Sequence, residues 1–386
     1  MKCLSTKATS IKPSGIRKFF DLASTMEGVI SLGVGEPDFA TPWHICENAI
    51  HYMSTGHTHY TANRGLLELR EEICKFHKEH YNQVYDPENE VIVTIGGSEA
   101  IDLCMRALLN PGDEVIVLDP NYVAYAPSVI LSDGVVVPLK LREENDFKIL
   151  PEDLKKVITP KTKAMIINYP SNPTGGVMTK EDYAKIIDII KESGIYVISD
   201  EIYAELSFDQ PFASLAQFDE IKSQIIVVNG FSKAYAMTGW RLGYCMANKE
   251  LSSVMNKIHQ YVIMSAPVMS QYAGIEAIKN GYNDVLMMKD DYLKRRNFLV
   301  NRLNRMGLKT NMPHGTFYVF CNIQSTGLDS ETFCERLLQE QKVACVPGNA
   351  FGNSGEGYVR ISYAYSIDHI KEAVVRLEQF LKDLDN

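Results

Sequence analysis

Short apolar runs alternate with longer amphipathic stretches through the middle of the chain. The runs of strand length occupy residues 91–95, 114–118, 135–139, 164–168, 196–199 and 225–229. Because they lack alternating polar positions, the pattern predicts strands buried on both faces of a sheet. Between two runs, residues 179–193 repeat apolar side chains along one helical face, and Gly194 follows as a C-cap. We therefore expect an α/β fold with a mostly parallel central sheet.

The two ends of the chain have a different pattern. Helical periodicity extends from Asn248 to about Met306, and the runs FYVFCNI, KVACVP and YVRISY then precede an amphipathic helix that begins near Ser366. This succession predicts a smaller α+β domain. The first residues are broken by Pro and Gly and resemble an arm. We expect an N-terminal arm (1–39) packed on the small domain, a large domain (40–280) and a small C-terminal domain (281–386).

Polar residues follow four of the apolar runs directly. They are Gly96, Gly97 and Ser98 after the run at 91–95, Asn172 after 164–168, Asp200 and Tyr203 after 196–199, and Lys233 after 225–229. Ligands of open α/β sheets bind outside the carboxyl ends of the strands. The pattern therefore predicts one site that gathers these side chains.

The connection after the run at 225–229 is too short for a crossover helix. Only about a dozen residues separate it from the next apolar run at 242–246. A parallel neighbour needs a longer crossover, so we expect residues 242–246 to form one antiparallel strand. Arg241, at its beginning, then returns to the edge that carries Lys233.

Composition narrows the possible functions. The chain has 39 Lys and Arg against 48 Asp and Glu, which disfavours a nucleic-acid or anionic membrane surface. Its eight cysteines include no CxxC or Cys/His cluster, so we expect reduced, mostly buried thiols and no metal site. There is no signal-peptide pattern and no apolar run of membrane-spanning length. These features predict a soluble, cytoplasmic protein.

Seven segments, in order and spread over essentially the whole chain, resemble the class I/II aminotransferases of fold type I, in particular the prokaryotic aromatic and aspartate branch. They are GEPDFATP (35–42), YTANRGLLELR (60–70), GGSEAI (96–101), YPSNPTGG (169–176), SDEIY (199–203), SKAYAMTGWRLGY (232–244) and YVRISYA (358–364). The resemblance implies a pyridoxal-phosphate-dependent enzyme with a mostly parallel sheet, one antiparallel strand and a smaller domain.

The resemblance also implies the residues that handle the cofactor ring. Lys233 corresponds to the lysine that holds pyridoxal phosphate as a Schiff base and then transfers the proton. Asp200 corresponds to the aspartate that pairs with the pyridine nitrogen, while Tyr203 and Asn172 correspond to the partners of the phenolic oxygen. Tyr122 corresponds to the aromatic residue stacked on the ring.

Three further groups follow from the same resemblance. Gly97, Ser98 and Arg241 would bind the phosphate through helix N–H groups and a guanidinium. Arg360 would bind the substrate α-carboxylate, with a backbone contact from Gly35. Tyr60 corresponds to a tyrosine that reaches the neighbouring subunit's phosphate site, which implies a homodimer with shared active sites.

Two positions depart from the animal aspartate aminotransferases. Gly230 replaces a serine that binds phosphate, and residues 257–268 contain no arginine for a side-chain carboxylate. Together with Tyr261 and nearby methionines, this favours an aromatic or broad amino donor, with 2-oxoglutarate as acceptor. Aspartate and acylated diaminopimelate remain alternative donors.

Each side chain also has a structural explanation. Lys233 could be solvated, Asp200 could cap a turn, Tyr203 and Tyr122 could be core residues, and Arg360 could form a structural ion pair. Other chemistries of fold type I, such as a carbon–sulfur lyase or an aminocyclopropane-carboxylate synthase, use the same cofactor residues. A transcription regulator would need an upstream helix-turn-helix domain, for which about forty residues leave no room. A dehydrogenase is disfavoured because GVGEPD (33–38) lacks the third glycine.

Overall fold

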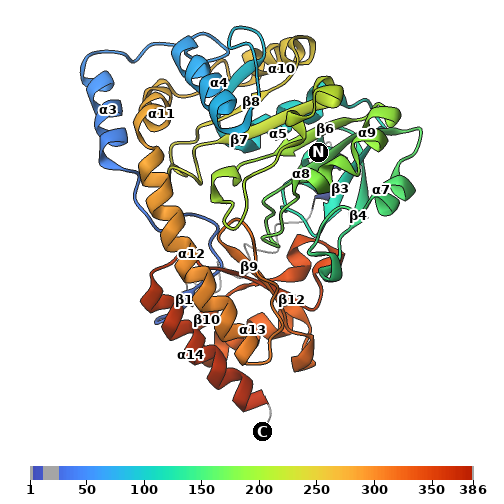
Figure 1. Ribbon diagram of the computed structural model, residues 1–386, viewed down its shortest axis with the longest axis vertical. Helices are drawn as coiled ribbons and strands as arrows, with labels where there is room; N and C mark the ends of the chain where they lie inside the picture. Colours follow the sequence, from blue (N-terminus) through green and yellow to red (C-terminus); the bar gives the residue numbers. More distant parts are fainter. Residues whose placement is uncertain (1–2, 12–25, 385–386) are drawn as a thin grey trace.

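A seven-stranded sheet lies in the upper part of the molecule (Figure 1). The computed structural model describes residues 3–11 and 26–384. The strand order is β2-β8-β7-β6-β5-β3-β4, with bounds β2 Val91–Thr94, β3 Glu114–Asp119, β4 Val135–Lys140, β5 Thr162–Asn168, β6 Tyr196–Asp200, β7 Ile225–Gly230 and β8 Gly243–Met246. Strand β8 pairs antiparallel with both β2 and β7, while the other pairs are parallel. The predicted mixed sheet and its antiparallel strand are confirmed.

Strand β4 differs from the expectation that every strand is buried on both faces. It lies at the edge of the sheet, and Val135 is 48% exposed. Pro138, which has no N–H to donate, is accommodated because β4 has only β3 as a neighbour. A run of valines therefore indicated a strand but not its position in the sheet.

Helices cover the sheet and connect its strands. They are α3 Trp43–Ser54, α4 Leu67–Tyr81, α5 Gly96–Leu108, α6 Tyr125–Leu131, α7 Pro151–Val157, α8 Lys180–Ala184, α9 Ile187–Ser193, α10 Lys249–Val262 and α11 Val268–Asn280. Short 3-10 helices occupy Glu143–Asn145, Ala204–Leu206, Leu215–Gln217, Asp219–Gln224, Gln324–Thr326, Gly348–Phe351 and Asn353–Gly355. Apolar side chains from these helices and from both sheet faces form two large cores.

The single helix predicted at 179–193 is two helices. A capping box between Thr179 and Asp182 starts α8, and the backbone N–H groups of Lys185 and Ile186 then bond three residues back instead of four. This tighter turn separates α8 from α9, yet the apolar face stays buried. Gly194 ends α9 with a φ of 67°, the left-handed C-cap that the sequence predicted.

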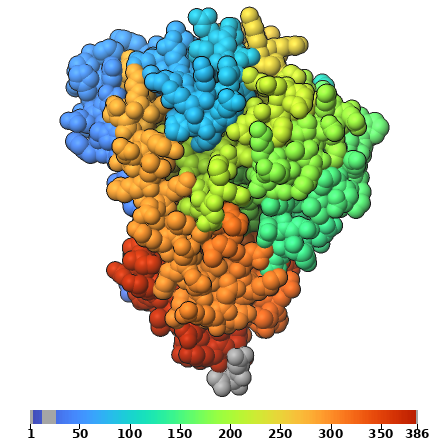
Figure 2. All heavy atoms as spheres, in the orientation of Figure 1, coloured from blue at the N-terminus to red at the C-terminus, as the bar shows by residue number. Residues whose placement is uncertain are grey.

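The C-terminal part forms the lower end of the molecule, coloured orange and red (Figure 2). Its elements are α12 Tyr282–Arg305, β9 Tyr318–Asn322, α13 Ser330–Gln341, β10 Val343–Ala344, β11 Val346–Pro347, β12 Tyr358–Ser362 and α14 Ile367–Leu384. Strands β11, β12 and β9 form an antiparallel sheet with its own apolar core. The run KVACVP forms two strands, β10 and β11, that belong to different sheets.

The described part of the N-terminal arm contacts both halves of the chain. Helix α1 (Thr6–Ser10) lies near α6, and Lys7 forms an ion pair of 2.7 Å with Asp133. Strand β1 (Ile30–Ser31) pairs in parallel with β10. Residues 12–25, which were predicted as part of the arm, lie outside the described residues. The predicted domain boundaries at residues 39 and 280 remain predictions.

Two other expectations concern cysteines and membranes. All eight cysteines are free, and five of them are buried. Across residues 3–11 and 26–384, we find no helix with the length and apolarity to cross a bilayer.

Candidate active site

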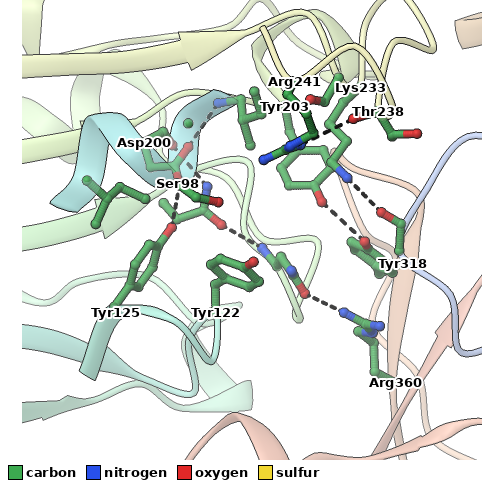
Figure 3. Close-up of a pocket in the computed structure, with 17 residues that line it drawn as sticks. Ser98, Tyr122, Tyr125, Asp200, Tyr203, Lys233, Thr238, Arg241, Tyr318 and Arg360 are labelled. Atoms are coloured by element: carbon green, nitrogen blue, oxygen red, sulfur yellow. Dashed lines mark hydrogen bonds between the residues drawn. The ribbon is translucent and has the colours of Figure 1, made fainter. Parts of the chain in front are cut away.

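One cavity of about 340 Å³ opens at the carboxyl edge of the central sheet (Figure 3). It collects all the residues predicted to bind the cofactor or the substrate except Tyr60. Its lining comprises Gly35, Gly97, Ser98, Ile101, Tyr122, Tyr125, Asn168, Asn172, Asp200, Ile202, Tyr203, Ser232, Lys233, Thr238, Arg241, Tyr318 and Arg360. The size is within the usual range for a cofactor-sized ligand. The cavity therefore lies where the polar residues at the ends of the strands predicted a binding site.

Lys233 lies in the turn that follows β7, and its amine points into the cavity. Its Nζ atom donates a hydrogen bond of 2.6 Å to the carbonyl oxygen of Gly35. Burial, together with the positive charge of Arg360, lowers the pKa of Lys233 from 10.5 to about 8. The residue is thus a buried amine that loses its proton more readily than a solvated lysine, which suits a nucleophile.

Asp200 ends β6 and is only 6% exposed. Its Oδ1 atom accepts a hydrogen bond of 3.2 Å from the N–H of Ile202, so it does cap a turn. Its Oδ2 atom accepts 2.6 Å from the hydroxyl of Tyr125, which also lines the cavity. Burial raises the pKa of Asp200 to about 6, although the hydrogen bond from Tyr125 opposes the shift. A cation beside this carboxyl group would therefore be stabilised strongly.

Arg360 lies in the middle strand of the C-terminal sheet and is 3% exposed. Its Nη1 and Nη2 atoms donate to the Asn172 side-chain oxygen at 2.9 Å and the Gly33 carbonyl at 2.7 Å. Both acceptors are neutral, so the structural ion pair considered above is absent from the described residues. The Nε atom is buried without a partner. A guanidinium has five N–H donors, so several remain free for a carboxylate.

The opposite end of the cavity is lined by Arg241 and the start of α5. Gly96 begins this helix with a φ of 71°, and a Cβ placed there would lie 2.8 Å from the Nη2 atom of Arg241. A glycine is therefore required for the guanidinium to approach the helix start. Gly97 and Ser98 follow in the first turn, where backbone N–H groups lack helical partners. This combination suits an anion.

Gly230, the departure from the serine pattern, has a packing explanation. A Cβ at this position would lie 3.0 Å from the backbone Cα of Gly243 in the adjacent strand β8. A serine would push these two strands apart. The close packing of β7 against β8 therefore explains why residue 230 is a glycine and not a serine.

Two predicted positions lie outside the cavity of this chain. Tyr60 is 84% exposed and does not line it. Tyr261, which the sequence interpretation placed near the pocket, is also 84% exposed and outside the lining. Within a single chain, Tyr261 therefore gives no support for an aromatic preference.

Seven lining residues were missed from the sequence, and three of them make contacts that bear on the site: Asn168, Tyr125 and Tyr318. Asn168 is the last residue of β5, so the rule of polar strand ends could have found it; its amide donates 2.9 Å to the carbonyl of Asp200. Tyr125 and Tyr318 had no comparable signal. They lie in the short helix α6 and in strand β9, which packing alone brings to the cavity.

The fold and the cavity are typical of one class of protein: an enzyme whose pocket combines a buried amine, a buried carboxyl group and guanidinium groups. The chain matches the family Aminotransferase class I and II over residues 27–377 and belongs to it. It is 50% identical to "Putative aminotransferase YugH" of Bacillus subtilis (98% of each chain covered) and 44% identical to an "Aspartate aminotransferase" of Pyrococcus abyssi (98% of each). The crystal structure of an "aromatic aminotransferase" from Pyrococcus horikoshii superimposes with a TM-score of 0.91 at 43% identity, covering 95% of this chain and 99% of that one. The chain is thus a pyridoxal-phosphate-dependent aminotransferase, as the resemblance implied.

Proposed function

We propose that this cavity binds pyridoxal phosphate between Lys233, Asp200 and Arg241 and moves amino groups between an L-amino acid and a 2-oxo acid. The observation that carries the proposal is the shared cavity itself, with an amine of lowered pKa, a buried carboxyl group and an anion site. Gly97, Ser98 and Arg241 would hold the phosphate. Residues of the chain therefore match each functional part of the cofactor.

The roles of the remaining residues follow from their positions. Asp200 would keep the pyridine nitrogen protonated, and Tyr203 with Asn172 would donate to the phenolic oxygen. Tyr122 would pack against the ring; its own ring lies 5.5 Å from that of Tyr125 in an edge contact. Bound in this way, pyridoxal phosphate supplies an electron sink for the bond broken at the substrate Cα.

The chain's own groups would carry the other tasks. Arg360 would bind the α-carboxylate through its free N–H groups, and Gly35 would add a backbone contact. Lys233, released by the incoming amine, would act as a neutral base. It would remove the proton from the substrate Cα and deliver it to the cofactor carbon that is bonded to the transferred nitrogen. Its lowered pKa supports this role, because a large fraction of the amine is unprotonated near pH 8.

The covalent role of Lys233 can be tested directly. Pyridoxal phosphate added to the protein should give the absorbance of a lysine-bound cofactor, and borohydride reduction should place the added mass on Lys233. Lys233→Ala should abolish both the absorbance and turnover. Lys371→Ala, at a 55% exposed side chain in α14, is the matched control. Near-normal transamination by Lys233→Ala would refute the proposal.

We propose an aromatic or broad amino donor and 2-oxoglutarate as acceptor. Four tyrosines line the cavity, at positions 122, 125, 203 and 318, and residues 257–268 contain no arginine for a second carboxylate. A panel of tyrosine, phenylalanine, aspartate and an acylated diaminopimelate would test this preference. Exclusive use of aspartate or of the diaminopimelate would reject it. Release of pyruvate from cystathionine would instead favour a carbon–sulfur lyase.

We also propose a homodimer in which Tyr60 completes the partner's phosphate site. Large apolar side chains are exposed at the end of α10 and just after it: Tyr261 84%, Val262 56% and Met264 45%. The Tyr60 segment adjoins this region, because Asn63 donates 2.8 Å to the carbonyl of Met264. Exposed apolar side chains that lie close together are typical of an interface.

Hybrid dimers test the contribution of Tyr60 across the interface. A dimer with one Lys233→Ala and one Tyr60→Ala subunit would contain one site with both residues intact if Tyr60 acts in the partner. At limiting pyridoxal phosphate, the hybrid should then exceed both mutant homodimers. No gain on mixing, or a monomer by light scattering, would contradict the proposal.

A further inference from the structure

Tyr318 contacts both the carboxylate-binding and the cofactor-binding parts of the cavity. It begins β9, is 1% exposed and lines the cavity between Arg360 and Tyr203 (Figure 3). Its hydroxyl lies 3.1 Å from the hydroxyl of Tyr203. The guanidinium carbon of Arg360 lies 4.2 Å from the centroid of its ring. One side chain therefore touches two functional groups from different parts of the fold.

The backbone leaves room for this phenol at one point. A Cβ added to Gly35 would lie 2.5 Å from the Tyr318 hydroxyl oxygen, so only glycine allows the approach. The same glycine accepts the hydrogen bond from Lys233. The hydroxyl of Tyr318 is thus enclosed by Gly35 on one side and Tyr203 on the other.

The number of hydrogens that each phenol can donate limits the direction of the hydrogen bond between Tyr203 and Tyr318. A phenol carries one hydrogen, and either Tyr203 or Tyr318 could donate. If Tyr203 donates to the phenolic oxygen of the cofactor, as proposed above, its only hydrogen is committed. Tyr318 must then donate to the oxygen of Tyr203. Burial raises the pKa of Tyr318, so this hydrogen is retained at working pH.

We propose that Tyr318 is a positioning residue that links the two ends of the reaction centre, with its hydroxyl strengthening the hydrogen bond that Tyr203 donates and its ring supporting the guanidinium of Arg360. The inference rests on the proposed function. Donation to Tyr203 polarises the Tyr203 O–H group, because consecutive hydrogen bonds reinforce one another. The ring contributes a cation–π contact that helps to fix the orientation of the guanidinium.

Two substitutions separate these contributions. Tyr318→Phe keeps the ring and removes the hydroxyl, whereas Tyr318→Leu removes both. The matched control is Tyr363→Phe, which removes another buried phenol of the same apolar core, bonded at 2.9 Å to the Thr316 carbonyl and outside the cavity. All three variants are compared with the cofactor-loaded enzyme by thermal unfolding and by absorbance.

The main readout is the pH at which the absorbance of the bound cofactor changes. A weaker donor to the phenolic oxygen should raise that midpoint, so Tyr318→Phe should shift it upward by about 0.3 pH units. In a Tyr203→Phe background the same substitution should give no further shift. An unchanged midpoint in Tyr318→Phe, or an equal shift in both backgrounds, would overturn the inference, and Tyr363→Phe should leave the midpoint in place.

The second readout concerns the amino donor. Tyr318→Phe should leave KM within about twofold, whereas Tyr318→Leu should raise KM about fivefold because a contact of roughly 1 kcal/mol with Arg360 is lost. Equal KM effects in both variants would refute the role of the ring. If no lysine-bound absorbance appeared in the parent enzyme, the proposed function itself would fail; absorbance without a coupled shift would remove only the role of Tyr318.

Discussion

The hydroxyl of Tyr125 donates a hydrogen bond of 2.6 Å to the Oδ2 atom of Asp200. Both groups are buried, and the pair connects α6 with the end of β6. Burial raises the pKa of Asp200 to about 6, and this hydrogen bond is the largest opposing influence. Tyr125 therefore helps to keep the carboxyl group ionised where a protonated ring nitrogen would need it.

Removing this donor should make Asp200 harder to ionise. We expect Tyr125→Phe to raise its pKa further, by about one unit, since a hydrogen bond to a charged group contributes roughly 1.5 kcal/mol. As the solution is acidified, the affinity of the cofactor-free variant for pyridoxal phosphate should therefore begin to fall at a pH about one unit higher than in the unsubstituted protein. Tyr169→Phe, which removes a buried phenol bonded to the Phe147 carbonyl, should leave this pH profile unchanged.

The amine of Lys233 should react at unusually low pH. Its pKa is lowered to about 8, so the neutral form becomes dominant above that pH instead of above 10.5. Reductive methylation of the cofactor-free protein, followed by mass spectrometry, should show half-maximal reactivity of Lys233 near pH 8. In urea the midpoint should return toward 10.5. A folded-state midpoint near 10.5 would show that burial does not neutralise the amine.

Arg360 should determine substrate binding more than cofactor binding. Arg360→Gln removes the charge and should raise KM for the amino donor about 100-fold, because paired charge-assisted hydrogen bonds contribute roughly 3 kcal/mol. Arg360→Lys keeps the charge but lacks the planar fork, so its KM for the amino donor should lie between those of the unsubstituted enzyme and Arg360→Gln. Equilibrium titration with pyridoxal phosphate should give similar affinities for all three proteins. A large loss of cofactor affinity would indicate a structural role instead.

Gly96 should be required for the anion site. Gly96→Ala adds a Cβ at 2.8 Å from Arg241 and strains a positive φ, so we expect both lower stability and cofactor affinity reduced about tenfold or more. Gly112→Ala is a matched control, since its φ is 88° but no atom lies within 4 Å of the added carbon. It should lower the unfolding temperature without changing cofactor affinity. Equal affinities in the two variants would contradict this account.

The sequence predicted the sheet because its strands are buried and therefore nearly uniform in apolar character. The antiparallel strand β8 was predictable because its connection is too short for a helix. The edge position of β4 was not, since apolar character does not report how many neighbours a strand has. The break between α8 and α9 was missed because a single tight turn leaves the apolar face in place.

The site was predictable where side chains follow strands and hidden where packing supplies them. Asp200 ends β6 and Lys233 follows β7, so topology alone brings them together. Tyr318 reaches the cavity only because the C-terminal sheet packs against this edge, and no local pattern encodes that contact. The predicted role of Tyr60 would require a second copy of the chain, which one sequence cannot place.

The short segment after β1 supplies an acceptor to each of two cations. Gly33 accepts from Arg360 at 2.7 Å and Gly35 accepts from Lys233 at 2.6 Å, while Leu32, just before them, is bonded to Ala344 and Ser362. The positions of both acceptors therefore depend on how Leu32 is held by these two backbone hydrogen bonds. Lengthening or shortening this segment would displace both carbonyl groups together. A change that alters substrate specificity without disturbing Lys233 must therefore arise in another part of the cavity wall.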